Sequence, residues 1–374
     1  MRGLETIPSS VVGMKINEWY NEIQKLDVIE AERLKEEVQQ EIENMEEDQD
    51  ALLYFQLMDL RHQMMLDYLF PKERNLTLAE YLKEIEGKGK KFSGLLQYYY
   101  SFFSGMYYFS EGKYIDAIRY YKIAEKKLSK VSDKIEKAEF YFKVAEVFYH
   151  MKQTHMSMYY IFLADDIYKK HPTYKARRIQ CHFVIAGNYV DLQSQDKALP
   201  YLHKALALAK EIENWSMITK ALLNMGICYQ HIESFQAIPF LLEAVKAGEK
   251  VQVKEITTAY YVLALINLID NNKIDGRKWL DKALESARMF DDDLFLALVN
   301  VLETLFMKQA DRIEVLESLE PLRNSQGYPY IEELALIAAE FYNKSERPND
   351  SVMFFKQMVD AQKQIRRGGL QDER

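Results

Sequence analysis

The sequence predicts an all-α fold in which a small N-terminal helical bundle precedes a long array of helical repeats. Apolar residues recur with the helical period of 3.6 in every long segment, whereas half-buried strands require a period of two. Glycine and proline are scarce, with 14 and 8 residues among 374, which leaves few of the turns that a β-rich chain needs. Small residues then recur about every 40 positions from Gly105 onward, as in a repeat array.

The first 70 residues predict a compact antiparallel bundle of three helices. Pro8 and two serines form a start signal before the first helix. Asp27, with Glu30 three residues later, resembles a capping box before the second. The sequence PKERN at 71–75 ends the third. Apolar side chains at helical spacing mark the helices: Val12, Ile16, Trp19, Tyr20 and Ile23; Ala31, Leu34, Val38, Ile42 and Met45; Leu52, Leu53, Leu57, Leu60, Met64 and Met65.

The remainder of the chain predicts tetratricopeptide repeats. From Gly105 onward, small and aromatic residues alternate at spacings that let paired helices approach closely while the aromatic rings fill the gaps. The last small residue of each copy recurs with a period near 40, longer than the standard 34: Ala124, Ala164, Ala205, Ala244 and Ala283. Weaker copies follow at 298–322 and 334–358. We therefore expect a bundle at 1–70, a helical linker at 71–94, and a right-handed superhelix of six to seven repeats at 95–374.

Charge and composition restrict the function classes. The net charge is −8 and the pI about 5.6, which argues against direct binding of nucleic acid because phosphates require a positive field. Two cysteines, Cys181 and Cys228, form no framework of the kind found in oxidising compartments. No apolar leader precedes the first helix, and the aromatic run at 95–109 is too short and too polar to span a bilayer. We expect a cytoplasmic protein without membrane contact.

The sequence lacks the motifs of a self-contained hydrolase. It contains no glycine-rich phosphate loop, no HExxH pair and no GxSxG turn. The seven histidines are scattered; His150 and His155 are five residues apart, which does not place them on one helix face. We expect no metal site and no cofactor of its own. If the chain takes part in catalysis, a partner must supply the nucleophile, metal or phosphoryl group.

Three polar residues on the expected first helices of successive repeats suggest a peptide site. Asn188, Asp191 and Asn224 accompany the small residues Gly187 and Gly226. An asparagine amide can both donate to and accept from a peptide backbone, and repeat arrays offer long concave surfaces to peptides. The alternative is that these are ordinary polar residues on an exposed helix face.

Several long segments together resemble one family. They are MKINEWY, NMEEDQDALLYF, LMDLRHQMMLDYL, IEKAEFYFKVAEVFYHMKQTHMSMYY and the closing AQKQIRRG. Over residues 7–368 the chain is similar to the Rap proteins of Bacillus, whose architecture matches the one expected above. The resemblance implies one of two functions. Some members dephosphorylate the response regulator of the sporulation phosphorelay, and others bind the DNA-binding domain of the competence regulator without catalysis. Many are inhibited by a short imported Phr peptide, a quorum-sensing signal that compacts the protein.

The resemblance also implies roles for particular residues. The catalytic glutamine of the EEDQ motif corresponds to Gln49, and an amide can orient a water for attack on an aspartyl phosphate, as the glutamine of GTPases does. The bound regulator would supply Mg²⁺. Asp48 and Leu52 would dock on the receiver, and Leu60 replaces an aromatic residue of the phosphatase members. Members that only bind the competence regulator also retain this glutamine, so Gln49 permits catalysis without proving it.

The peptide site carries over in the same way. Asp191 matches the acid of the family's AGNxxD motif, and Asn224 the asparagine of its NxGxCY segment. We expect Asn188 and Asn224 to clamp the peptide backbone while Asp191 pairs with a cationic group. A generic repeat scaffold without peptide control would explain the repeats, but it leaves the EEDQ motif, the bundle and the asparagines unexplained.

Overall fold

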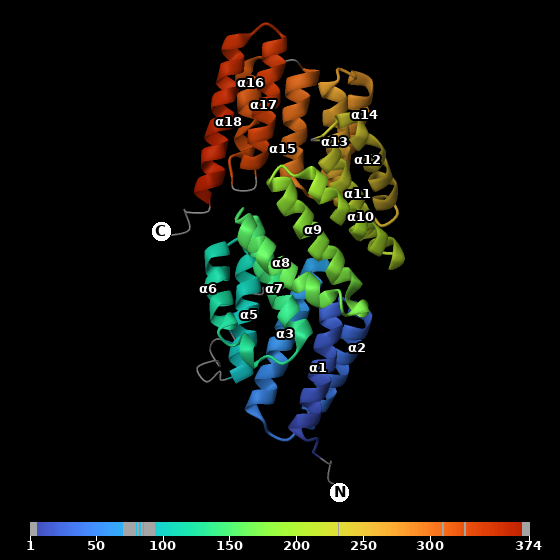
Figure 1. The fold of residues 1–374 in the computed structure, drawn as a ribbon, viewed down its shortest axis with the longest axis vertical. Helices are drawn as coiled ribbons and strands as arrows, with labels where there is room; N and C mark the ends of the chain where they lie inside the picture. Colours follow the sequence, from blue (N-terminus) through green and yellow to red (C-terminus); the bar gives the residue numbers. More distant parts are fainter. Residues whose placement is uncertain are drawn as a thin grey trace. The chain divides into compact units, whose positions relative to one another are not determined.

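The computed structural model describes residues 6–69, 80, 82–83, 85, 94–230, 232–308, 310–324 and 327–368. These residues are almost entirely helical, which confirms the predicted fold class (Figure 1). Contacts divide the chain into two compact units, Met1–Val184 and Ile185–Arg374. These units reflect contacts within the chain and do not test the predicted domain boundaries at 70 and 94, which stay a prediction. The linker expected at 71–94 lies almost wholly outside the described residues.

The first three helices are α1 (Ser9–Lys25), α2 (Val28–Ile42) and α3 (Gln49–Leu69). The start signals act as expected: Pro8 precedes α1, and the Asp27 side chain accepts from the backbone N–H of Glu30 to cap α2. The three helices are also tied by polar contacts. Lys35 of α2 pairs with Asp59 of α3 at 2.7 Å, and the indole N–H of Trp19 donates to His62 Nδ1 at 2.9 Å.

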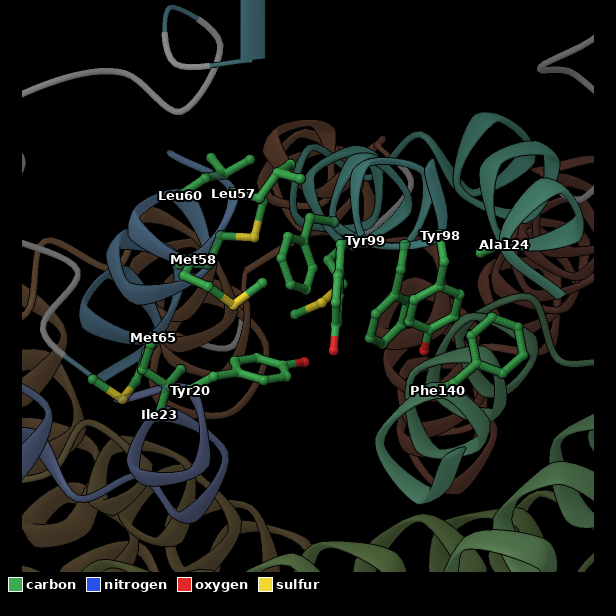
Figure 2. Close-up of a cluster of buried hydrophobic side chains, with 14 of the residues drawn as sticks. Tyr20, Ile23, Leu57, Met58, Leu60, Met65, Tyr98, Tyr99, Ala124 and Phe140 are labelled. Carbon is green, nitrogen blue, oxygen red and sulfur yellow. The ribbon is translucent and has the colours of Figure 1, made fainter. Parts of the chain in front are cut away.

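The bundle does not have a core of its own. One hydrophobic cluster runs from Val12 in α1, through Leu57 and Met58 in α3, to the aromatic residues of the following helices. Those helices are α5 (Gly94–Ser110) and α7 (Lys134–His150). Figure 2 shows Tyr20 of α1 and Met58 of α3 facing Tyr98 and Tyr99 of α5. Because the cluster is continuous, the bundle and the first repeats form one packed unit.

The repeats are antiparallel helix pairs, as the 40-residue period predicts. The small residues act where expected: a Cβ added at Gly105 would lie 2.4 Å from the Tyr121 ring, so only glycine allows this helix approach. In the first unit the pairs are α5 with α6 (Tyr114–Glu125) and α7 with α8 (Thr154–Tyr168). The first helix of the next pair, α9 (Lys175–Asp191), begins in this unit.

In the second unit the regular pairs continue and then become less regular. The helices are α10 (Gln195–Glu211), α11 (Trp215–Gln230), α12 (Ser234–Gly248), α13 (Glu255–Ile269), α14 (Lys273–Met289), α15 (Asp293–Leu302), α16 (Arg312–Ser318), α17 (Tyr328–Lys344) and α18 (Pro348–Gly368). A π-helical turn, Glu303–Met307, continues α15, and α16 is short. The weaker copy predicted at 298–322 coincides with this irregular region, whereas the one at 334–358 falls on the regular pair α17 and α18. Among the described residues, no helix is long and apolar enough to cross a membrane.

Candidate functional site

The segment that leads into α3 is held in place by the start of the chain. The backbone N–H of Ile7 donates to the carbonyl of Asn44 at 2.9 Å, and Glu46 N–H donates back to the Ile7 carbonyl at 3.0 Å. Glu46 also uses its carboxylate, which accepts from the backbone N–H of Ser9 at 2.9 Å and so caps α1. One acid of the EEDQ motif therefore has a structural role.

Asp48 caps α3 from the residue before its first turn. Its Oδ1 accepts from the backbone N–H groups of Asp50 and Ala51 at 2.9 and 3.1 Å. The hydroxyl of Ser9 is the largest cause that lowers the pKa of Asp48, and the two backbone donors add to it. The carboxylate therefore remains ionised well below neutral pH, and a docking role for Asp48 would be additional to this capping role.

Gln49 is the first residue of α3 and is exposed. Two contacts just before it hold this part of the backbone: Asp48 caps the first turn of α3, and Glu46 accepts from the backbone N–H of Ser9. The positive end of the helix dipole lies at this terminus. The side-chain amide is thus carried by rigid backbone and faces solvent, where it could contact a bound water and an anionic group together.

The two leucines expected at a partner surface differ in exposure. Leu52, one turn after Gln49, is half-buried, whereas Leu60 is fully buried within the continuous core (Figure 2). Leu60 is therefore covered by the chain itself in this structure, and its contact with a partner stays a prediction. Helical periodicity places Leu60 on an apolar face, but it cannot say whether a partner or the chain's own helices cover that face.

The residues expected to bind a peptide also differ in exposure. Asp191, the last residue of α9, is exposed, and Asn224 in α11 is half-buried. Asn188 is fully buried, and its expected contact with a peptide backbone stays a prediction. The two asparagines occupy different registers: Asn188 follows Gly187 by one residue, whereas Asn224 precedes Gly226 by two. Because this offset of three is nearly one turn, the two asparagines have similar directions relative to the glycines of their own helices, α9 and α11.

Sequence analysis missed a buried polar network at the centre of the first unit. Glu136 and Glu139 of α7 are both fully buried. Glu139 accepts from Arg61 of α3 and Arg177 of α9, each at 3.0 Å, and from Tyr168 at 3.1 Å. The sequence IEKAEFYF contains the signal for this network, because Glu136 and Glu139 lie about one helical turn apart among apolar residues.

Among the described residues, no group of three acidic, histidine or cysteine side chains could hold a metal ion. Both cysteines are buried thiols, and burial raises the pKa of each above its ordinary value. The exposed amide of Gln49, at the start of the helix that Asp48 caps, is accordingly the strongest candidate for chemistry in the first unit. Asp191 and Asn224 are the candidates for recognition in the second.

Comparisons with known proteins extend over nearly the whole chain. Residues 6–67 match the family described as response regulator aspartate phosphatase H, N terminal. The chain is 47% identical to response regulator aspartate phosphatase E of Bacillus subtilis (strain 168), over 97% of this chain and 98% of that protein. The chain belongs to the Rap family. Phosphatase A of the same organism is 46% identical, covering 98% of each chain.

The family also contains members with a different name. Regulatory protein RapC of Bacillus subtilis (strain 168) is 39% identical over 96% of both chains. A solved Rap protein complexed with competence and sporulation factor has a TM-score of 0.85 and 37% identity, covering 96% of this chain and 100% of that one. Relatives of this Rap protein thus include named phosphatases, a named regulatory protein and a Rap protein complexed with competence and sporulation factor.

Proposed function

We propose that this Rap protein hydrolyses the aspartyl phosphate of a response regulator of the sporulation phosphorelay, with Gln49 as its water-positioning residue. The observation that carries the proposal is the exposed amide of Gln49 at the start of α3, where Asp48 caps the helix. An aspartyl phosphate is already an activated acyl phosphate, and the receiver brings Mg²⁺. The reaction then needs a well-placed water, which an amide can hold without titrating.

The relatives' names support this reaction class over simple sequestration. Identity is 47% and 46% to phosphatases E and A, against 39% to regulatory protein RapC. In the proposed complex Gln49 accepts a hydrogen bond from the attacking water and donates one to a phosphoryl oxygen. Asp48 and Leu52, beside it on the same turn, contact the receiver.

The test is single-turnover loss of phosphate from a phosphorylated receiver with Mg²⁺. We expect wild type to accelerate the loss and Gln49→Ala to abolish the acceleration while it still binds the receiver. Gln39→Ala is the matched control, because Gln39 is an exposed glutamine of α2. If wild type binds a regulator but accelerates nothing, the protein is a non-catalytic anti-activator of a competence-type regulator, binding its DNA-binding domain.

We also propose that a short imported peptide of the Phr class inhibits this protein through Asp191 and Asn224. A solved relative at 37% identity holds such a peptide, the competence and sporulation factor. The amide of Asn224 would bond to the peptide backbone, and the Asp191 carboxylate would pair with a cationic group. Neither residue lies in the unit that contains Gln49, so inhibition and chemistry can be separated by mutation.

Peptide control is tested with competence and sporulation factor as the probe. Asn224→Ala should abolish inhibition and leave regulator binding intact, while Asn300→Ala, an exposed asparagine of α15, should leave inhibition unchanged. Inhibition that survives Asn224→Ala would place the peptide elsewhere. A wild-type protein that does not respond would exclude this peptide as its ligand.

A further inference from the structure

The two buried glutamates of α7 have different partners. Glu139 is held by the arginines Arg61 and Arg177. Glu136, one turn earlier, forms no ion pair with any described residue. Its three partners are neutral donors: the Tyr20 hydroxyl at 2.7 Å, the Gln24 amide at 2.8 Å and the Tyr98 hydroxyl at 2.7 Å.

The donors to Glu136 come from two parts of the first unit, the N-terminal bundle and the first repeats. Tyr20 and Gln24 belong to α1, and Tyr98 belongs to α5. Figure 2 shows the rings of Tyr20, Tyr98 and Tyr99 between Met58 of α3 and Phe140 of α7. Glu136 therefore bridges the bundle and the repeats, and any separation of the two parts breaks its hydrogen bonds to α1.

We propose that Glu136 is a proton-linked latch, which takes up a proton from solvent when α1–α3 pack on α5 and α7 and releases it when they separate. The geometry suits both charge states. Gln24 Oε1 is buried without a hydrogen-bond partner among the described residues. Rotation of this amide by half a turn exchanges its donor for an acceptor, so Gln24 can accept from the protonated carboxyl as readily as it donates to the ionised one.

The surroundings of Glu136 favour the protonated form in the packed arrangement. Burial raises the pKa of Glu136 from 4.5 to about 7, although the hydrogen bonds from Tyr20 and Tyr98 oppose the rise. Arg61 and Arg177 are each bonded to Glu139 and are thereby engaged elsewhere. The titratable and charged groups around the site come from every packed element: Tyr20 (α1), Tyr54 and Arg61 (α3), Tyr98 and Tyr99 (α5), Asp133 (the N-cap of α7), Glu139 (α7), Tyr168 (α8) and Arg177 (α9).

The direction of the coupling follows from linkage. When the parts separate, water reaches Glu136 and its pKa returns toward 4.5. The packed state therefore binds the proton more tightly, and packing weakens as the pH rises from about 4.5 through 7. Between pH 6 and pH 8 the packing equilibrium should fall about tenfold. This inference concerns packing alone and does not depend on the proposed phosphatase activity.

The first test follows packing by fluorescence energy transfer in the full chain. Dyes are attached to cysteines introduced at Ile29 and Met156, which are 86% and 41% exposed, whereas both native cysteines are buried. We expect the packed fraction of wild type to fall between pH 6 and pH 8. Glu136→Gln should remain packed at both. Glu125→Gln should behave as wild type, because it removes a matched carboxylate that accepts from Tyr160 at the surface.

The second test detects the proton itself and does not require a measurable unpacked fraction. The infrared difference between wild type and Glu136→Gln should contain the carbonyl stretch of a protonated carboxylic acid at pH 6, and the band should vanish by pH 8. Absence of the band at pH 6 would mean that Glu136 is ionised and would overturn the proposal. The proposal would also be overturned if the packed fraction of Glu136→Gln changed with pH in the same way as that of wild type.

Discussion

The cores of the two compact units differ in the polar groups that they bury. The first unit buries ionisable side chains from α1, α3, α5, α7, α8 and α9 around Glu136 and Glu139. Among the described residues of the second unit, the buried polar groups are mostly hydroxyls, such as Thr257 and Ser286, whose oxygens lie 2.6 Å apart. The buried carboxylate of this unit, Asp350, is paired with two partly exposed arginines.

This difference separates two ways of joining helices. In the second unit, shape determines the packing: a Cβ added at Gly226 would lie 2.6 Å from Leu241, so the helices meet where glycine leaves room. In the first unit, the buried polar groups around Glu136 and Glu139 join the bundle to the repeats. Buried charges weaken an interface relative to apolar packing of the same volume. The first unit is therefore the one whose packing can respond to solution conditions.

The largest expected effect is at Glu139. Glu139→Gln keeps the volume but leaves Arg61 and Arg177 buried without their counter-charge, which should lower the unfolding free energy by about 3–5 kcal/mol. Denaturant unfolding measures the loss. Asp350→Asn is the matched change in the second unit and should cost clearly less, because water can solvate its two arginines. Equal losses would remove the contrast between the cores.

Glu136 should affect stability with a pH dependence that Glu139 does not share. Its carboxyl binds the proton more tightly in the folded chain, so the unfolding free energy should fall by roughly 3 kcal/mol as the pH rises from about 4.5 to above 7. For Glu139, burial alone would raise the pKa, but Arg177 and Arg61 lower it overall, so its contribution is lost only at acidic pH. Urea unfolding of Glu136→Gln across this range should lack the wild-type slope.

A smaller effect is expected from overpacking the second unit. Gly226→Ala would force Leu241, which is fully buried, to shift, at a cost of about 1–3 kcal/mol. Gly13→Ala is the control, because nothing lies within 4 Å of its added Cβ and it lies within α1. That change should stabilise the chain by roughly 0.5–1 kcal/mol. If both changes stabilise, the close approach at Gly226 is not required.

The smallest expected effect separates the two roles of Asp48. Asp48→Ala removes the cap of α3 and should cost about 1 kcal/mol in unfolding free energy. Asp48→Asn keeps a capping oxygen and should leave stability nearly unchanged. Receiver binding by the two variants, measured by titration calorimetry, then isolates the charge: weakened binding by Asp48→Asn would indicate a direct contact, and unchanged binding a capping role alone.

The sequence by itself determined the helices, their caps and the repeat period. Asp27 caps α2 and Gln49 begins α3, because a side-chain cap depends on residues two or three positions away. The positions of Gly105 and Gly226, where adjacent helices approach closely, can also be read from the sequence, because small residues recur there with the period of the repeats. These features are local, so the order of residues along the chain is enough to specify them.

Only the tertiary structure decided which apolar and charged faces are covered. Leu60 and Asn188 are buried where sequence analysis expected surface contacts. Arg61 and Glu139 are 78 positions apart, and Tyr20 and Glu136 are 116 apart. Periodicity reports the direction of a side chain from its own helix but not the partner that it meets. The buried polar network around Glu136 and Glu139 depends on such distant partners, so only the packed structure reveals it.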